Sequence, residues 1–144
     1  MLAAALSNLA AISVSGVTSY ALDHTPDSLV SAQLPALVIL PELSGEMPGL
    51  QPNGFSAGVG QVTAQIAHVL LVAPVVSGMG SKTLLPDLVS LIDAYVAALA
   101  GDPTLGGALA LVLMFTIRAG VVRYSGVEYH GAVFTHTWVM NLGG

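Results

Sequence analysis

The side chains best suited to chemistry gather near the end of the chain, in VRYSGVEYHGAVFTHTWVMN, residues 122–141. This segment holds Glu128, His130, His136 and Trp138, residue types that can bind a metal or act as an acid–base pair. On a β-strand all four share one parity and therefore one face. His130 and His136 would nevertheless stand about 20 Å apart, too far to share one metal ion. We expect solvent-facing or packed strand histidines that titrate at about pH 6–7, and a core or interface role for Trp138.

The remaining histidines and the paired acidic residues do not complete such a site. His24 and His68 lie far away in the sequence, and a zinc site needs three or four convergent ligands. The acidic pairs lie in turn-rich segments, where Asp and Glu are expected without any function. They are Asp23 with Asp27, and Glu42 with Glu46. We therefore predict no catalytic, cofactor-binding or metal-binding residue.

Motifs for nucleophilic catalysis and nucleotide binding are incomplete. Ser125, in YSGVE, lacks the G-x-S-x-G turn of a serine nucleophile. GVG at 58–60 opens no helix, and GMGSKT at 78–83 lacks the first glycine of a phosphate-binding loop, because position 75 is valine. The chain has no cysteine, which excludes disulfides and thiol catalysis. These observations predict a protein that is not an enzyme and that needs no cofactor.

The most unusual property of the composition is its scarcity of charge. Only 8% of the 144 residues are charged and 54% are hydrophobic, whereas roughly 25% are charged in an ordinary domain. Such a surface tends to associate, so we expect much of it to form an interface. The net charge is −5, and the only basic residues are Lys82, Arg118 and Arg123. Tight binding to a phosphate backbone needs more cations, so DNA could meet this protein only as a non-adhesive wall.

The length and the order of segments predict a single domain over residues 1–144, with no membrane span and no signal peptide. The stretch 47–81 lacks charged residues, but prolines, glycines and polar residues interrupt it. The cleaner run 104–117 has 14 residues, fewer than the roughly 20 that a span needs. A secretory signal is not expected either, since no basic residue precedes Lys82.

The spacing of apolar residues predicts two helices. Leu2, Leu6 and Leu9 form one stripe of a short helix over 2–12. A longer helix is predicted over 85–100, with Pro86 and Asp87 in its first turn and Gly101 at its end. Its outer face is poor in charge, so we expect it to contact a neighbour too. The predicted apolar stripe is Leu88, Leu91, Ile92, Tyr95, Val96 and Leu99, and the outer face is Ser90, Asp93, Ala94, Ala97 and Ala98.

Strands are predicted on both sides of the central helix. Alternating polar and apolar residues over 61–76 indicate a strand in which His68 points inward, with the parity of Ile66 and Leu70. The segment 43–60 is rich in Gly, Pro, Ser and Asn and predicts a long loop or extended arm. The other predicted elements are strands at 16–22 and 34–42, turns at 23–28, 77–82 and 101–107, a β-rich segment at 108–124 that breaks at Ala119–Gly120, and a last strand at 127–140 that follows a turn at Ser125–Gly126.

These elements predict an α+β fold. A mixed, mainly antiparallel sheet is expected, with the N-terminal helix and the central helix (about 85–100) packed on it and a C-terminal β-hairpin.

Four stretches of the chain resemble the tail-terminator, or tail-completion, proteins of long-tailed bacteriophages. Together they span more than half of the chain, whereas 43–60 has no match and the charge is unusually low. The stretches are YALDHTPDSLVSAQLPALVILPE (20–42), LLPDLVSLIDAYVAAL (84–99), AGDPTLGG (100–107) and GVVRYSGVEYHGAVFTHTWV (120–139).

The resemblance implies a structural virion protein that forms a homohexameric ring at the head-proximal end of the tail tube. Such a ring ends tube polymerisation and joins the tail to the head connector, and DNA passes through its lumen. The implied partners are other copies of the chain, the tail-tube protein and the head–tail connector or stopper protein. The implied location is the virion, with assembly in the host cytoplasm.

The ring hypothesis carries two further expectations. Six copies at −5 each would carry −30, and an electronegative lumen would repel DNA phosphates and let the genome slide. The segment 43–60 and the hairpin 120–140 are the expected contact elements.

Two alternatives stay open at the level of the sequence. The first is another ring of the same particle, namely a stopper or head-completion protein or a tail-tube subunit. The second is a small enzyme or ligand-binding domain, which predicts a monomer or dimer with a deep pocket near His68 or His130.

Overall fold

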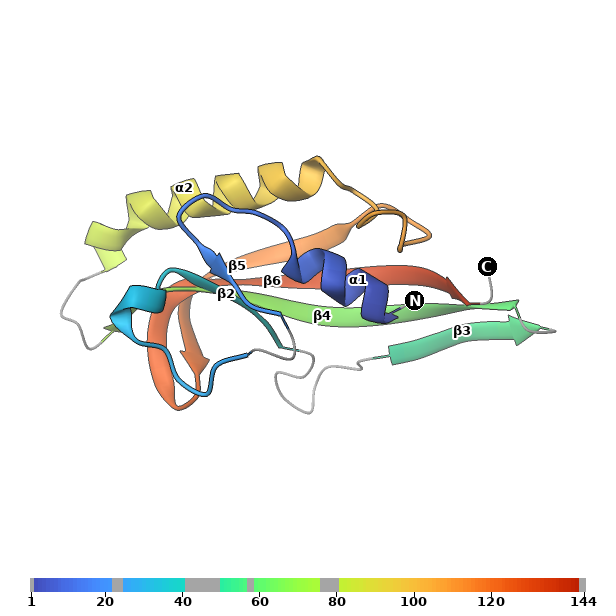
Figure 1. Ribbon diagram of the computed structural model, residues 1–144, viewed down its shortest axis with the longest axis horizontal. Coiled ribbons are helices and arrows are strands. Elements are labelled where there is room, and N and C mark those ends of the chain that lie inside the picture. The colour runs from blue at the N-terminus through green and yellow to red at the C-terminus, as the bar shows by residue number, and fades with distance from the viewer. Residues whose placement is uncertain (1, 22–24, 41–49, 57–58, 76–80, 143–144) are drawn as a thin grey trace.

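A computed structural model of the chain describes residues 2–21, 25–40, 50–56, 59–75 and 81–142. Two α-helices pack on one face of a mixed, mainly antiparallel sheet whose two longest strands run along the length of the molecule (Figure 1). The predicted α+β fold class, including its C-terminal hairpin, is therefore confirmed.

The helices and strands of the described residues follow the predicted order. Helix α1 spans Leu2–Ala10, a 3₁₀ turn η2 spans Ser31–Gln33, and helix α2 spans Ser81–Ala100. The strands are β1 Thr18–Ser19, β2 Ala36–Leu40, β3 Leu50–Ser56, β4 Val59–Pro74, β5 Met114–Tyr124 and β6 Val127–Leu142. The sheet order is β1-β2-β4-β6-β5, with β3 pairing β4 beyond the end of β2. Of the predicted strand at 16–22, only the two residues of β1 pair, and they run parallel to β2.

Strands β4 and β6 form the centre of the sheet. They pair antiparallel from Gly60 opposite Leu142 to Pro74 opposite Tyr129, with a register shift between Leu71 and Ala73. The alternation of polar and apolar residues that predicted β4 arises because successive side chains of a strand point to opposite faces. In β4, residues of one parity point into the core under the helices. His68 has that parity and is fully buried, which confirms the inward orientation predicted for it.

Of the long loop or extended arm predicted over 43–60, the loop is wrong where the structure describes the segment, because an extended strand lies there. Residues 50–56 form β3, which pairs with residues 59–64 of β4, while 43–49 and 57–58 lie outside the described residues. In the sequence, the proline and the glycine of this segment argue against a strand. An edge strand tolerates both, because one row of its backbone groups needs no ladder partner. The register shifts between Pro52 and Gly54, where the proline lacks an N–H to donate.

Helix α2 confirms the predicted central helix but begins one turn earlier. Because it begins at Ser81, Pro86 and Asp87 lie in its second turn, and the prediction of both in the first turn is wrong. Leu84, Leu88, Tyr95 and Leu99 are buried against the sheet. Val96, which was expected in the apolar stripe, is 39% exposed, whereas Ala94 and Ala98 of the supposed outer face pack against the core.

The chain after α2 differs from its prediction in two places. Residues 108–113 form turns and irregular structure instead of a strand, and β5 runs without interruption through Ala119 and Gly120. Gly120 stays in the ladder opposite Gly131, so the predicted break does not occur. The turn into β6 is confirmed: Ser125 and Gly126 have φ of 51° and 79°, the two positive values of a type I′ hairpin turn.

The core consists of two apolar clusters, one on each face of the sheet. The larger cluster joins α1 and α2 to the sheet and includes the fully buried Leu9, Leu37, Leu99 and Trp138. The smaller one, on the opposite face, includes Val38, Val69, Leu71, Val122, Tyr124 and Tyr129. Chain from the 20–34 segment covers it, because Tyr20, Leu29 and Leu34 pack against this cluster. The hydroxyls of Tyr124 and Ser125 hold the same segment by donating to the carbonyls of Pro26 and Asp27.

We expect Gly131→Ala to destabilise the protein by about 1–3 kcal/mol or more, the cost of overpacking a filled interior. A Cβ at this position would lie 1.8 Å from the Leu70 carbonyl oxygen, and a backbone atom of a central strand cannot move aside cheaply. Urea unfolding measures the change. Gly101→Ala is the matched control, since its added Cβ would lie 3.5 Å from the nearest atom, an ordinary contact. Equal decreases in the free energy of unfolding for the two variants would contradict a clash at Gly131.

Candidate functional site

Among the described residues, exposed aliphatic side chains occur on both α2 and β5. Leu85, Val89 and Val96 lie on one flank of α2, about a quarter turn around the helix from the buried Tyr95. Ile117 and Val121 of β5 are 41% and 56% exposed and point to the same face of the sheet as α2. We call these five residues the apolar surface. Grouped exposed aliphatic residues are typical of a contact site, whereas scattered ones are not.

Strand β5 adds an open backbone edge to the apolar surface. It pairs with β6 along all 11 of its residues, and its other side has no strand beside it in the described part of the chain. A long edge strand presents unpaired N–H and C=O groups that invite pairing with another chain. Proteins usually protect such edges with charges, yet β5 carries only Arg118 and Arg123.

A hollow of about 160 Å³ lies between the start of α2 and the middle of β5. Its floor is formed by Leu84, Leu88 and His130, which are buried, and its rim by Leu85, Ala119 and Gly120, which are exposed. The lining is almost wholly apolar. The hollow therefore interrupts the apolar surface at the point where α2 and β5 adjoin.

Beneath α2, four side chains form a directed chain of hydrogen bonds in the core. The Trp138 indole can only donate, and its Nε1 lies 3.3 Å from Nδ1 of His136, so that nitrogen accepts. His136 must then carry its proton on Nε2, which donates to the Tyr95 hydroxyl at 2.7 Å. The Tyr95 hydroxyl in turn donates to Nδ1 of His68 at 2.8 Å. The network thus fixes one tautomer for each histidine.

Burial makes the charged forms of this network unfavourable. Desolvation lowers the pKa of His136 to about 4, and desolvation with repulsion from His136 lowers the pKa of His68 to about 3. Burial also raises the pKa of the Tyr95 phenol. Nε2 of His68 has no partner within the described residues, and an unpaired buried donor costs about 1–3 kcal/mol. A general base must reach a substrate proton, and these three side chains are at most 1% exposed and line none of the four hollows described for residues 2–21, 25–40 and 81–142. Their arrangement holds α2 on the sheet.

The residues that the sequence placed on one face of the last strand keep their shared parity in β6, but their surroundings differ. Glu128 is exposed and forms a surface ion pair with Arg123 at 3.7 Å, which contributes little stability. His130 forms part of the floor of the hollow, and Trp138 is a fully buried core residue, as expected. The expectation that His136 titrates at about pH 6–7 is wrong, because it is fully buried and its pKa falls to about 4.

Distance along the sequence does not predict the neighbours of His68. The sequence places it far from the other histidines, but the β4–β6 register places Ile66 opposite His136, and the two histidine rings lie 6.4 Å apart. The parity of His68 was a usable signal that it entered the core. Its partner and the bridging role of Tyr95 were missed, since no local pattern reveals which strand residues face each other.

The other residues considered as sites have ordinary structural roles where they are described. Ser125 lies in the hairpin turn, and Gly60 and Ser81 lie in the first residues of β4 and α2. Asp27 accepts the Ser125 hydroxyl through its backbone carbonyl. His24, Asp23, Glu42, Glu46 and residues 78–80 lie outside the described residues.

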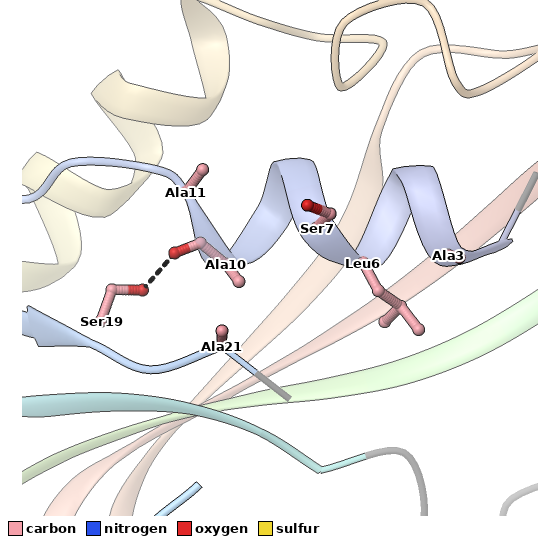
Figure 2. A pocket seen from close by; sticks show the side chains of 7 residues that line it. All are labelled: Ala3, Leu6, Ser7, Ala10, Ala11, Ser19 and Ala21. Carbon is pink, nitrogen blue, oxygen red and sulfur yellow. Dashed lines mark hydrogen bonds between the residues drawn. The ribbon is translucent and has the colours of Figure 1, made fainter. Parts of the chain in front are cut away.

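In the other hollows that the described residues line, several polar side chains already have hydrogen-bond or ion-pair partners. Figure 2 shows the one beside α1, about 410 Å³ in volume, which exists because alanines and serines line it. The hydroxyl of Ser19 there already donates to the Ala10 carbonyl at 2.8 Å. A hollow of about 360 Å³ beside Asn8 and Asp102 has both polar side chains bonded to nearby backbone. A third, of about 510 Å³, lies beside the hairpin turn and contains Asp27 and Arg123.

Comparisons with known proteins add no family to this description. No protein-family model matches the chain, and no curated protein matches it. Over the described residues, no cluster of three or more His, Cys, Asp or Glu side chains is arranged to hold a metal ion. Neither α1 nor α2 combines the length and the apolar character needed to cross a membrane.

We expect the protein to lose stability as the pH falls below about 6.5. In the folded state His68 and His136 stay neutral down to pKa values of about 3 and about 4, while in the unfolded chain they take up protons near 6.5. Because folding lowers both pKa values, the two neutral histidines contribute their full stabilisation above pH 6.5, and this contribution decreases as the pH falls towards 4. Two such groups lower the free energy of unfolding by about 3 kcal/mol between pH 8 and pH 5.5.

Urea titrations at the two pH values measure this difference. The double variant His68→Gln/His136→Gln should flatten the profile. A free energy of unfolding that is equal at pH 8 and pH 5.5 in the wild-type protein would contradict a pair of buried neutral histidines.

We expect Tyr95→Phe to cost about 1–3 kcal/mol of stability, since it leaves a donor of His136 and an acceptor of His68 buried without partners. Tyr20→Phe, a half-buried tyrosine outside the network, is the control for loss of a hydroxyl. Thermal unfolding at pH 8 compares the two variants, and equal midpoints would argue against the bridging role of Tyr95.

Proposed function

We propose that this chain is a structural virion protein that forms a homo-oligomeric ring at the head-proximal end of a phage tail tube. In this role it ends tube polymerisation and joins the tail to the head connector, and DNA passes through its lumen. The observation that carries the proposal is the apolar surface, together with the open edge of β5. A chain with 8% charged residues and such a face needs neighbours to complete its exterior.

The proposed ring follows from the position of these features on one side of the molecule. Leu85 of α2 and Ala119 of β5 line one hollow, so the helix flank and the edge strand adjoin. A neighbouring copy could bury both at once. A contact between this side of one copy and a different surface of the next copy would be heterologous, and such a contact closes into a ring when its rotation allows.

The sheet face away from the helices has the properties expected of a wall along which DNA slides. Beyond the smaller core cluster, the register places Gln65 beside Thr137 and Thr116 beside Thr135. We call this the threonine face; Arg118 is its only charge among the described residues. It carries no carboxylate there, so the electronegative lumen that we hypothesise would arise from the −30 of a six-copy ring as a whole.

A ligand-binding or enzymatic role is the less favoured candidate. It predicts a deep pocket near His68 or His130, whereas His68 is fully buried and lines none of the hollows described above, and the hollow at His130 has about 160 Å³. Ligand pockets usually measure about 300–1,000 Å³ and contain converging polar groups. A stopper protein or a tube subunit shares the predicted surface, so those two alternatives must be separated by experiment.

We expect the purified chain to form closed rings of six copies, with six times the 14.6 kDa mass of the chain. Light scattering coupled to size exclusion gives the mass, and electron microscopy shows the form. Rings added to purified tail tubes should bind one end and stop further growth. Long polymers of the chain alone would indicate a tube subunit. A stable monomer would refute the proposal.

Val121→Asp should weaken the ring, because it places a charge in the apolar surface. Val30→Asp is the control, since Val30 is 62% exposed but lies before η2, away from that surface. Circular dichroism confirms that both variants fold. Equal ring content in the two variants would show that the apolar surface is not the contact.

A further inference from the structure

Two exposed aliphatic side chains project from the loop that joins α2 to β5. Leu111 is 53% exposed and Val112 is 61% exposed, and they are adjacent. Loop residues on both sides of them are anchored: the Ala110 N–H donates to the Val139 carbonyl and the Leu113 N–H to the Pro103 carbonyl, each at 2.7 Å. The loop is therefore a structured projection, which we call the knob.

The rest of the loop holds the knob in place. Leu105 and Leu109 are buried in the larger core cluster, and the Asn8 side chain donates to the Leu105 carbonyl at 2.6 Å. An apolar group held in position loses little conformational freedom when it is buried by a partner. No charged residue occurs from Thr104 to Ile117, so burying the knob desolvates no charge.

The hollow between α2 and β5 matches the knob in size and chemistry. Its volume of about 160 Å³ is close to the roughly 150 Å³ of an apolar cavity that admits a benzene molecule. The volume of one aliphatic side chain of the knob is of the same order. The lining contains one titratable side chain, His130, and no carboxylate or cation. A central apolar anchor in a pocket is the usual arrangement of a contact that carries much of the binding energy.

A single chain cannot place its own knob in its own hollow. The knob follows the C-terminal end of α2, whereas Leu84 and Leu88 lie in its first two turns (Figure 1). Twelve residues of helix separate Leu88 from Ala100, about 18 Å at 1.5 Å per residue. Along β5, about 16 Å of strand separates Met114 from Ala119.

We propose that the occupant of the hollow is the knob of a second copy of this chain, with Leu111 or Val112 inserted between α2 and β5 of its neighbour. Each copy then offers a knob at one end of α2 and a hollow at the other, which makes the contact heterologous and allows a ring to close. This contact deepens the proposed ring and rests on it.

The absence of cysteine allows a direct test on the full chain. Leu85→Cys places a thiol on the rim of the hollow and Val112→Cys places one on the knob. The two single variants are purified, mixed under dissociating conditions, reassembled and treated with a short bis-maleimide. We expect cross-linked dimers containing one of each variant in the mixture, and at least about tenfold fewer from either variant alone. Val30→Cys replaces Val112→Cys as the control and should give no such product.

A second measurement uses the same contact without cross-linking. Val112→Asp should raise the concentration at which oligomers form by at least about tenfold, and Val30→Asp should leave it unchanged. Circular dichroism shows whether each variant folds. Cross-links of Val112→Cys to itself would indicate a symmetric contact and overturn the inference, as would the absence of the mixed product.

The outcomes separate this contact from the proposed function. Closed rings without the mixed cross-link would reject the knob and hollow but leave the ring standing. The mixed cross-link in open filaments would support the contact and reject a terminator. If the hollow instead receives a different protein, the purified chain alone would give no mixed product and Val112→Asp would not alter its oligomers.

Discussion

The contact of Tyr95 with the sheet is the constraint on which the rest of the structure depends. Its ring stacks on Phe134 with centroids 3.7 Å apart, and its hydroxyl bridges His68 and His136. One rotation of α2 about its axis satisfies both the stacking and the hydrogen bonds. That rotation places Leu85, Val89 and Val96 on the flank that faces away from the core, so the exposed apolar surface is a consequence of the buried polar network.

A polar network in an apolar core has a cost and an effect. The cost is the unpaired Nε2 of His68 and the penalty against protonating either histidine. The effect is orientation, because hydrogen bonds are directional whereas apolar packing tolerates sliding and rotation. These hydrogen bonds therefore favour one position of α2 on the sheet. We regard the Trp138–His136–Tyr95–His68 chain as the feature that selects it.

The same geometry links the core to assembly. The position of α2 determines the hollow against β5, and the anchored loop after α2 determines the knob. Both features are built from uncharged residues, as is most of the exterior. A monomer with this surface would associate indiscriminately, whereas a knob and a hollow at opposite ends of one helix would direct the association to a single geometry. The threonine face, which is polar but nearly uncharged, lies on the other side of the sheet and remains available to line a channel.

What the sequence determined alone was local. The helix periodicity over 85–100, the alternation over 61–76 and the Ser125–Gly126 turn predicted α2, β4 and the hairpin, because each depends on neighbouring residues and on backbone preferences. Their sum predicted the α+β class. Tertiary structure decided whatever depends on partners distant in the chain. Residues 50–56 are a strand because β4 supplies their hydrogen bonds, and His68 meets His136 because the β4–β6 register brings them together. Val96 is exposed because Tyr95 orients the helix, and the hollow exists only where α2 and β5 adjoin, a relation that no local pattern of residues contains.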